Sequence, residues 1–198
     1  MRRPLVFAAW PLAGWLCLAA AAGWRDAPLP PEAERLNRTA DHAASAPTAV
    51  RLYAQSLKLA PSNGPALYGL GLALLDQNRP ADALKVFRRL AALHPGEADV
   101  LEALAAAIAR QPGLRRADVA EGRALAFQAT QLQSDRPEAW HVLSVLSHLD
   151  GDYAAAAAAA RRAVELDAQN PSDPETTALY QQQEIACTDA LSVFSPLD

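Results

Sequence analysis

The sequence has little of what several protein classes depend on. Two cysteines in 198 residues are too few for a disulfide scaffold or a cysteine-based zinc module. Aromatic residues make up only 6% of the chain, which argues against an all-β sandwich. Lysine occurs only at Lys58 and Lys85, the net charge is −4, and no clustered basic face suggests nucleic acid as a partner.

The familiar motifs of catalysis are also missing. There is no glycine-rich phosphate loop, nucleophile elbow, CxxC or HExxH pattern. His141 and His148 are seven residues apart, whereas a metal pair on one helix is usually spaced by three or four. We therefore expect no enzyme activity, metal, cofactor or small-molecule substrate.

Alanine is the most abundant residue, and it dominates a composition that is 51% hydrophobic. Alanine loses no side-chain entropy in a helix, so this excess predicts an all-α fold. The single cysteine outside the N-terminal segment, Cys187, is expected to be a buried, inert thiol.

The N-terminal segment is the longest apolar run. Arg2 and Arg3 precede it, and it extends from Leu5 to Trp24 without a charge. As a helix it would span about 30 Å, the thickness of a hydrocarbon core. Residues 1–24 are thus either an uncleaved signal anchor or a signal peptide cleaved after the small residues 20–22. Residues 25–31, rich in proline, would form a linker.

The rest of the chain has an internal period. One series of leucines has spacings of 34, 34 and 39 residues, and a second has spacings of 34, 39 and 34. The longer intervals share one explanation, an insertion of five residues around 111–115. The first series is Leu36, Leu70, Leu104 and Leu143, and the second is Leu59, Leu93, Leu132 and Leu166.

Each period divides into two amphipathic helical stretches separated by turn residues. The pattern resembles the tetratricopeptide repeat, a helix-turn-helix unit of 34 residues. The sequence departs from the repeat pattern at three positions. Asn37 stands where the pattern has a small residue, Gly122 where it has alanine, and Ser134 where it has proline. The positions that carry the resemblance are Leu67, Leu70, Gly71, Ala83, Phe87 and Pro95 in one copy, and Trp140, Leu143, Gly151, Tyr153, Ala156 and Ala163 in the last.

The resemblance implies a right-handed superhelical stack of about four repeats, because a single helical hairpin cannot bury both of its apolar stripes. The repeats would cover 30–63, 64–97, 98–136 and 137–170, within a repeat region of 32–170. A C-terminal capping helix and tail would occupy 171–198. Small residues such as Gly71 would let paired helices approach, and bulky ones such as Phe87 would fill the remaining space.

In this family the first helices of the repeats line a concave groove. The wall expected here is mostly apolar, which suits an extended or helical peptide with apolar anchors. Alternatively, these side chains pack against one another or against the final helix. The predicted groove residues are Tyr68, Leu72, Leu75, Glu102, Ala106, Arg110, His141, Val145 and His148.

Together these features predict a non-enzymatic scaffold or adaptor of the bacterial cell envelope, bound to a protein or peptide partner. It would lie at the inner membrane with a periplasmic repeat domain, or be periplasmic or secreted if the leader is cleaved. By analogy, envelope complex assembly (c-type cytochrome maturation, pilus or secretion biogenesis) is the expected setting. The alternative is a self-associating structural protein that uses the groove or the cap as its interface.

Overall fold

The computed structural model describes residues 28–194, and this part of the chain is entirely helical apart from its turns. The predicted leader 1–24 and the first three residues of the predicted linker, 25–27, lie outside the described residues. Within 28–194, no helix combines the length and apolar character needed to cross a bilayer. The helices are α1 (Pro31–Asp41), α2 (Ala46–Leu59), α3 (Gly64–Asp76), α4 (Pro80–Leu93), α5 (Ala98–Ala109), α6 (Arg116–Leu132), α7 (Pro137–Asp150), α8 (Tyr153–Gln169) and α9 (Pro174–Phe194).

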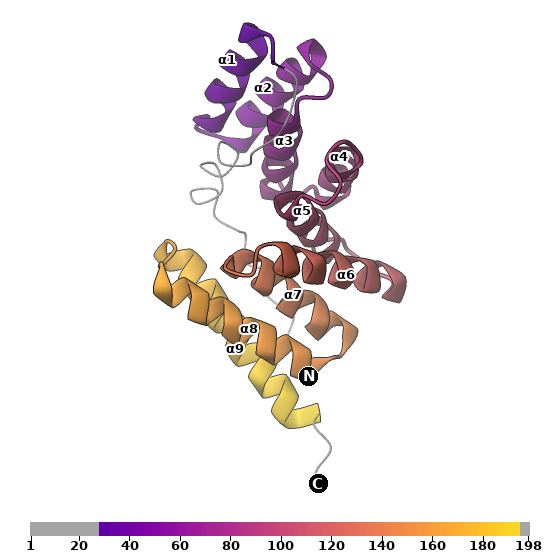
Figure 1. Cartoon of the computed structure of the whole chain (residues 1–198), viewed down its shortest axis with the longest axis vertical. Helices are drawn as coiled ribbons and strands as arrows, with labels where there is room; N and C mark the ends of the chain where they lie inside the picture. Colours follow the sequence, from indigo (N-terminus) through magenta and orange to yellow (C-terminus); the bar gives the residue numbers. More distant parts are fainter. Residues whose placement is uncertain (1–27, 195–198) are drawn as a thin grey trace.

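The helices stack in chain order from α1 at one end to α9 at the other (Figure 1). Each helix packs against the next, and the first helices α1, α3, α5 and α7 also contact one another in sequence. Neighbouring second helices make at most marginal contact. The stack is therefore curved, with the first helices forming its inner row, as the repeat pattern predicts.

Local sequence signals set the helix boundaries. Proline occupies the first turn of most helices, where its missing N–H costs nothing. The side chains of Asn63 and Asp152 accept hydrogen bonds from backbone N–H groups at the starts of α3 and α8. Gly151 ends α7 in the left-handed conformation, at φ 84°.

Paired helices meet through small residues placed opposite rings. Gly69 lies against Tyr53, and Gly71 lies against Phe87. Tyr53 and Phe87 are both fully buried, and Phe87 also packs edge-on against Tyr68. The expected alternation of small and bulky positions is thus present within a repeat, between α3 and α4, and also between successive repeats, where α2 meets α3.

The insertion in the third repeat is divided between a loop and a helix. The loop between α5 and α6 covers residues 110–115, whereas the corresponding loop of the preceding repeat, between α3 and α4, covers only residues 77–79. In addition, α6 has 17 residues where α4 has 14. The expectation that the turn alone is enlarged is therefore incomplete, because part of the extra length adds to the helix.

The first repeat accommodates its unusual Asn37 with a buried polar contact. The Asn37 and Asn63 amides donate to each other's oxygens at 3.2 and 3.3 Å. Asn63 also donates to Ser56 Oγ at 2.9 Å, and that hydroxyl donates to the Ala33 carbonyl at 3.1 Å. These bonds link α1, α2 and the start of α3.

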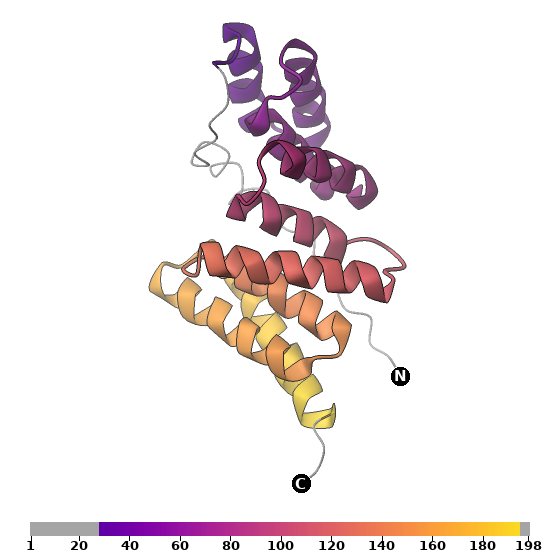
Figure 2. The same cartoon turned by 45° about the vertical axis from the view of Figure 1, so that its right-hand side comes forward.

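Helix α9 completes the stack as the predicted cap. It packs along α8 and also contacts α7, and both views show it beside α8 at the C-terminal end (Figures 1 and 2). The buried Asp167 carboxylate fixes the corner between α8 and α9 by accepting from Ser172 N at 2.9 Å and Thr177 Oγ at 2.7 Å. Cys187 is fully buried between the two helices, as expected.

Candidate protein-binding face

The nine predicted groove residues all lie on α3, α5 and α7 or, for Arg110, at the end of α5, within the inner row. The structure buries five of them and leaves four half-buried. The row is therefore more closely packed than an open groove wall would be. The buried residues are Tyr68, Leu75, Glu102, Ala106 and His141, and the half-buried ones are Leu72, Arg110, Val145 and His148.

Helix α9 packs against the part of this row that the fourth repeat supplies. The His141 ring packs against the Tyr180 ring with centroids 5.1 Å apart. Further along α7, His148 Nδ1 lies 3.7 Å from Cys187 Sγ, and its ring meets Tyr153 edge-on. The two histidines therefore have separate surroundings and do not act as a pair.

The third repeat contributes an interaction with its neighbour. Arg110 donates from Nη2 to the Leu75 carbonyl at 3.0 Å, across the ends of α5 and α3. Burial lowers the pKa of the Arg110 guanidinium. This arginine closes the end of α3 and is not a free cation on the wall.

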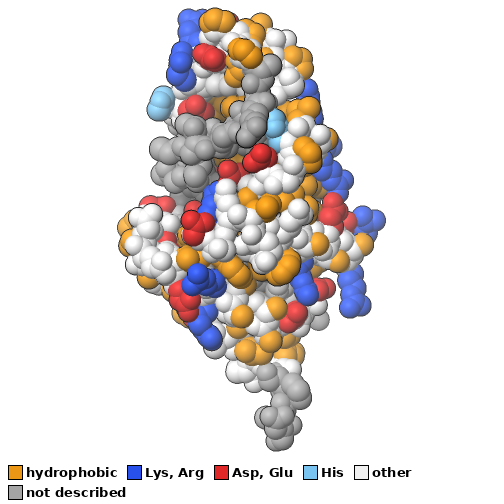
Figure 3. All heavy atoms as spheres, viewed as in Figure 1, with side chains coloured by type: hydrophobic (Ala, Val, Ile, Leu, Met, Phe, Trp, Pro, Cys, Tyr) orange, Lys and Arg blue, Asp and Glu red, His pale blue; other side chains and the backbone are white. Residues whose placement is uncertain are grey.

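The main polar feature of the inner row is the carboxylate cluster of Asp99, Glu102 and Glu138, which surrounds the Arg136 guanidinium. Arg136 Nη1 bonds Asp99, Nη2 lies 3.6 Å from Glu102 Oε2, and Nε lies 3.6 Å from Glu138 Oε2. Asp99 and Glu102 lie on α5, and Arg136 and Glu138 are at the start of α7. Three carboxylates thus share one guanidinium. In the space-filling view of Figure 3, acidic and basic side chains lie beside one another near the middle of the molecule.

The cluster is strongly desolvated. Glu102 is 1% exposed, and burial, with Glu138 as a second cause, raises the pKa of its carboxyl well above the ordinary value. Burial also raises the pKa of Tyr68 and Tyr180, each of which is further affected by Glu102 and Glu138. The pKa of His141 falls to about 4 because of burial. At neutral pH this region therefore favours an uncharged His141 and works against a charged Glu102.

Polar atoms of this region are left without a hydrogen-bond partner. They include Arg136 Nη2, Glu102 Oε1 and the Tyr180 hydroxyl, the last two in side chains that are 1% exposed. Buried polar groups are nearly always satisfied, so such exceptions require an explanation. Sequence reasoning identified Glu102 and Tyr68 but missed Asp99, Arg136, Glu138 and Tyr180. A signal for Asp99 existed, since it precedes Glu102 by three residues and shares its helical face.

The one cysteine–histidine contact of the described chain does not make a nucleophile. Gln183 Nε2 donates to Cys187 Sγ at 3.2 Å, and burial raises the pKa of the thiol to about 11. Reactive cysteines have lowered pKa values and partial exposure. Within residues 28–194, no three His, Cys, Asp or Glu side chains are placed to hold a metal ion.

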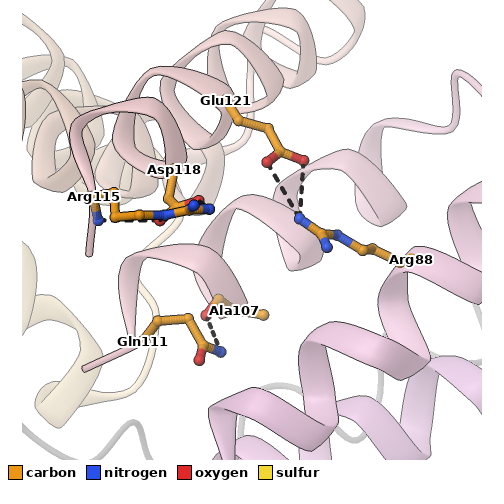
Figure 4. Close-up of polar contacts among 6 residues, drawn as sticks. All are labelled: Arg88, Ala107, Gln111, Arg115, Asp118 and Glu121. Atoms are coloured by element: carbon orange, nitrogen blue, oxygen red, sulfur yellow. Dashed lines mark hydrogen bonds and ion pairs between the residues drawn. The ribbon is translucent and has the colours of Figure 1, made fainter. Parts of the chain in front are cut away.

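The outer face has a different character. Between α6 and α8 lies a hollow of about 870 Å³ whose lining includes Phe127, Trp140 and several alanines. Phe127 is 55% exposed. Close by, Arg88 of α4 reaches Glu121 of α6 at 3.3 Å, and Arg115 and Asp118 pair at the start of α6 (Figure 4). Arg88 and the neighbouring Arg89 are both exposed, so they belong to a solvated outer face.

Comparisons with known structures extend over most of the stack. The chain resembles MamA residues 41 to the end from Desulfovibrio magneticus RS-1 (TM-score 0.62, 13% identity, 84% of this chain and 94% of that one). It resembles TTC0263, a thermophilic TPR protein from Thermus thermophilus, at TM-score 0.61 and 21% identity, over 84% and 91%. A Thermobaculum terrenum O-GlcNAc transferase mutant matches at 25% identity and TM-score 0.57, over 70% of this chain but only 26% of that enzyme.

No curated protein sequence matches the chain. A family model does match, described as the tetratricopeptide repeat, over residues 33–98 and 113–171. These two segments cover most of α1, all of α2 to α4, and all of α6 to α8, and the unmatched residues 99–112 hold most of α5 and the start of the loop after it. With the period, the small and bulky packing positions and the stacked hairpins, this match shows that the chain belongs to the tetratricopeptide repeat family.

Proposed function

We propose that this protein is a non-enzymatic adaptor that holds a segment of a partner polypeptide against its inner row of helices. Tetratricopeptide repeats build protein–protein interaction scaffolds, and the match covers most of the chain. The observation that supports the inner row as the binding face is its buried cluster with unsatisfied polar atoms, among them Glu102 Oε1 and the Tyr180 hydroxyl. Packing alone would be served better by apolar residues of similar volume.

The adaptor is proposed to act in the bacterial cell envelope. The support is the sequence of residues 1–24, where paired arginines precede a long apolar run. Retained, this segment tethers the protein to the inner membrane with the repeats in the periplasm; cleaved, it releases them there or outside the cell. Sequencing the N-terminus of the mature protein, together with extraction of membranes at alkaline pH, distinguishes the two forms. A mature protein that keeps Met1 and stays in the cytosolic fraction contradicts the envelope assignment.

Within the envelope, we place the adaptor in the assembly of a multiprotein complex, such as c-type cytochrome maturation, pilus biogenesis or secretion. This step rests on analogy with other tethered repeat proteins. Identification of a partner decides among these settings.

Site-specific photo-crosslinking in the producing cells tests the binding face. A photoreactive amino acid in place of Leu72, which is half-buried on α3, should yield a discrete band of this protein crosslinked to its partner. The same residue at Ala92, exposed on the outer helix α4, is the matched control and should yield none. Crosslinks from Ala92 alone, or from neither position, would contradict binding at the inner row.

The second candidate is self-association through the outer face. The exposed Phe127 beside the hollow between α6 and α8 favours it, because large exposed apolar side chains often mark interfaces. Sedimentation of the full chain in mild detergent tests this reading. A dimer that Phe127→Ser dissociates supports self-association, and a monomer at all concentrations rejects it.

A further inference from the structure

From the carboxylate cluster, we propose that the inner row between α5, α7 and α9 binds a single lysine or arginine side chain of the partner polypeptide. This proposal rests on the adaptor function above and adds which side chain of the partner the inner row recognises, here called the cationic anchor. The occupant is a cation on a peptide, recognised by Asp99, Glu102 and Glu138 together with the hydroxyl of Tyr180.

The first argument is charge. Arg136 is the cation that contacts Asp99, Glu102 and Glu138 in the described chain, so three carboxyl groups share one guanidinium, and burial favours the neutral form of Glu102 as long as no further cation is bound. An anionic anchor would be repelled, whereas a second cation would balance the cluster.

The second argument is geometry. Arg136 bonds Asp99 directly, but its separations from Glu102 and Glu138 are both 3.6 Å, longer than a hydrogen bond. Those two carboxylates therefore retain acceptor capacity, and a lysine ammonium or arginine guanidinium supplies donors without competing acceptors.

The third argument comes from a buried, unpartnered hydroxyl that a different helix supplies. The Tyr180 side chain comes from α9, is 1% exposed, and has no partner for its hydroxyl. Its ring packs against the His141 ring with centroids 5.1 Å apart, and His141 lies one helical turn after Glu138 on α7. The charges of Glu138 and Glu102 are among the causes that raise the pKa of Tyr180, in agreement with this position. The Tyr68 ring lies on the α3 side and its pKa responds to the same charges.

A metal ion is the competing cation. No three acidic, histidine or cysteine side chains within the described residues come close enough to hold one. The spread of the carboxylates around Arg136 instead fits a larger organic cation that reaches several acceptors.

The test is a selection of random linear peptides displayed on phage, performed on the full chain in mild detergent. The enriched peptides should share one lysine or arginine. In calorimetry, replacing that residue with norleucine (for lysine) or citrulline (for arginine) should weaken binding at least about tenfold. Glu102→Gln should weaken the basic peptide similarly and abolish the difference between basic and neutral peptides. Tyr180→Phe should weaken the basic peptide more than the neutral one.

Glu165→Gln is the matched control. It makes the same chemical change on the half-exposed outer side of α8, where Glu165 pairs with Arg162, and should leave affinity unchanged. Two results would contradict the cationic anchor without contradicting the adaptor function. The first is binding of peptides that share no basic residue, and the second is a preference for basic over neutral peptides that persists in Glu102→Gln. Failure to enrich any peptide would count against the adaptor function itself.

Discussion

The backbone of Gly71 lies directly against the ring of Phe87. A methyl group at Gly71 would stand 2.4 Å from Cζ of Phe87, well inside contact distance. Because the ring is fully buried, it has no free space into which to move. The close approach of α3 and α4 thus depends on a missing side chain.

Gly71→Ala should therefore destabilise the protein by about 1–3 kcal/mol, the usual cost of overpacking a core. Phe87→Leu in the same chain should recover part of this loss, which a double-mutant cycle in urea would measure. Gly122→Ala is the milder comparison, because the new methyl would meet Leu146 Cδ2 at 3.0 Å and Ile108 Cγ2 at 3.1 Å, so these neighbours need to shift by only a few tenths of an ångström. It should change stability by less than about 1 kcal/mol, since alanine also favours the helix.

Asn63→Ala should destabilise the first two repeats by about 2–4 kcal/mol. The change removes the cap of α3, worth about 1 kcal/mol, and leaves the buried Asn37 amide without its partner. Urea unfolding followed by circular dichroism measures the effect. The neighbouring exposed Ser62→Ala serves as the control and should be nearly neutral. Equal effects of the two changes would show that the buried network contributes little.

Glu102→Gln should stabilise the free protein at neutral pH. The folded state raises the pKa of this carboxyl, so stability is lost as pH rises from the unfolded pKa through the folded one. A neutral amide removes that loss and keeps the shape of the side chain. Thermal unfolding at pH 4 and pH 7.5 should show the gain at the higher pH only. A destabilised variant at pH 7.5 would mean that Glu102 is a favourable ionised partner of Arg136.

Peptide affinity should rise with pH for the same reason. A bound cation favours the ionised form of Glu102, so binding below its raised pKa releases a proton. Calorimetry in buffers of different ionisation enthalpy detects this proton release. Glu102→Gln should abolish it, and a basic peptide that binds without any proton release would contradict this role of Glu102.

His141 should make the fold sensitive to mild acid. Its pKa is about 4 in the folded state, below the ordinary value near 6.5, because the ring is buried. The unfolded chain therefore takes up a proton first as pH falls, and roughly 3 kcal/mol of stability is lost between about pH 6.5 and 4. His141→Gln should flatten this part of the pH–stability curve, whereas His42→Gln, at an exposed position after α1, should not.

Much of the fold could be predicted from the sequence. The period of 34 residues, the proline-rich turns and the small residues opposite rings identify the repeats, since each helix pair repeats the same local pattern. The inner row was also predictable, because its members recur at fixed positions in each repeat. The leader, the partner and the cellular location remain predictions.

The sequence by itself determined the helices and the order in which hairpins stack, because these depend on contacts within a repeat and on apolar faces that must be covered. Only the tertiary structure decided that Arg136 meets Asp99 and Glu102 from the preceding repeat, and that Tyr180 reaches the same region from α9. Those positions belong to no repeated pattern. Their meeting depends on how neighbouring repeats, and the capping helix, settle against one another once their cores are filled.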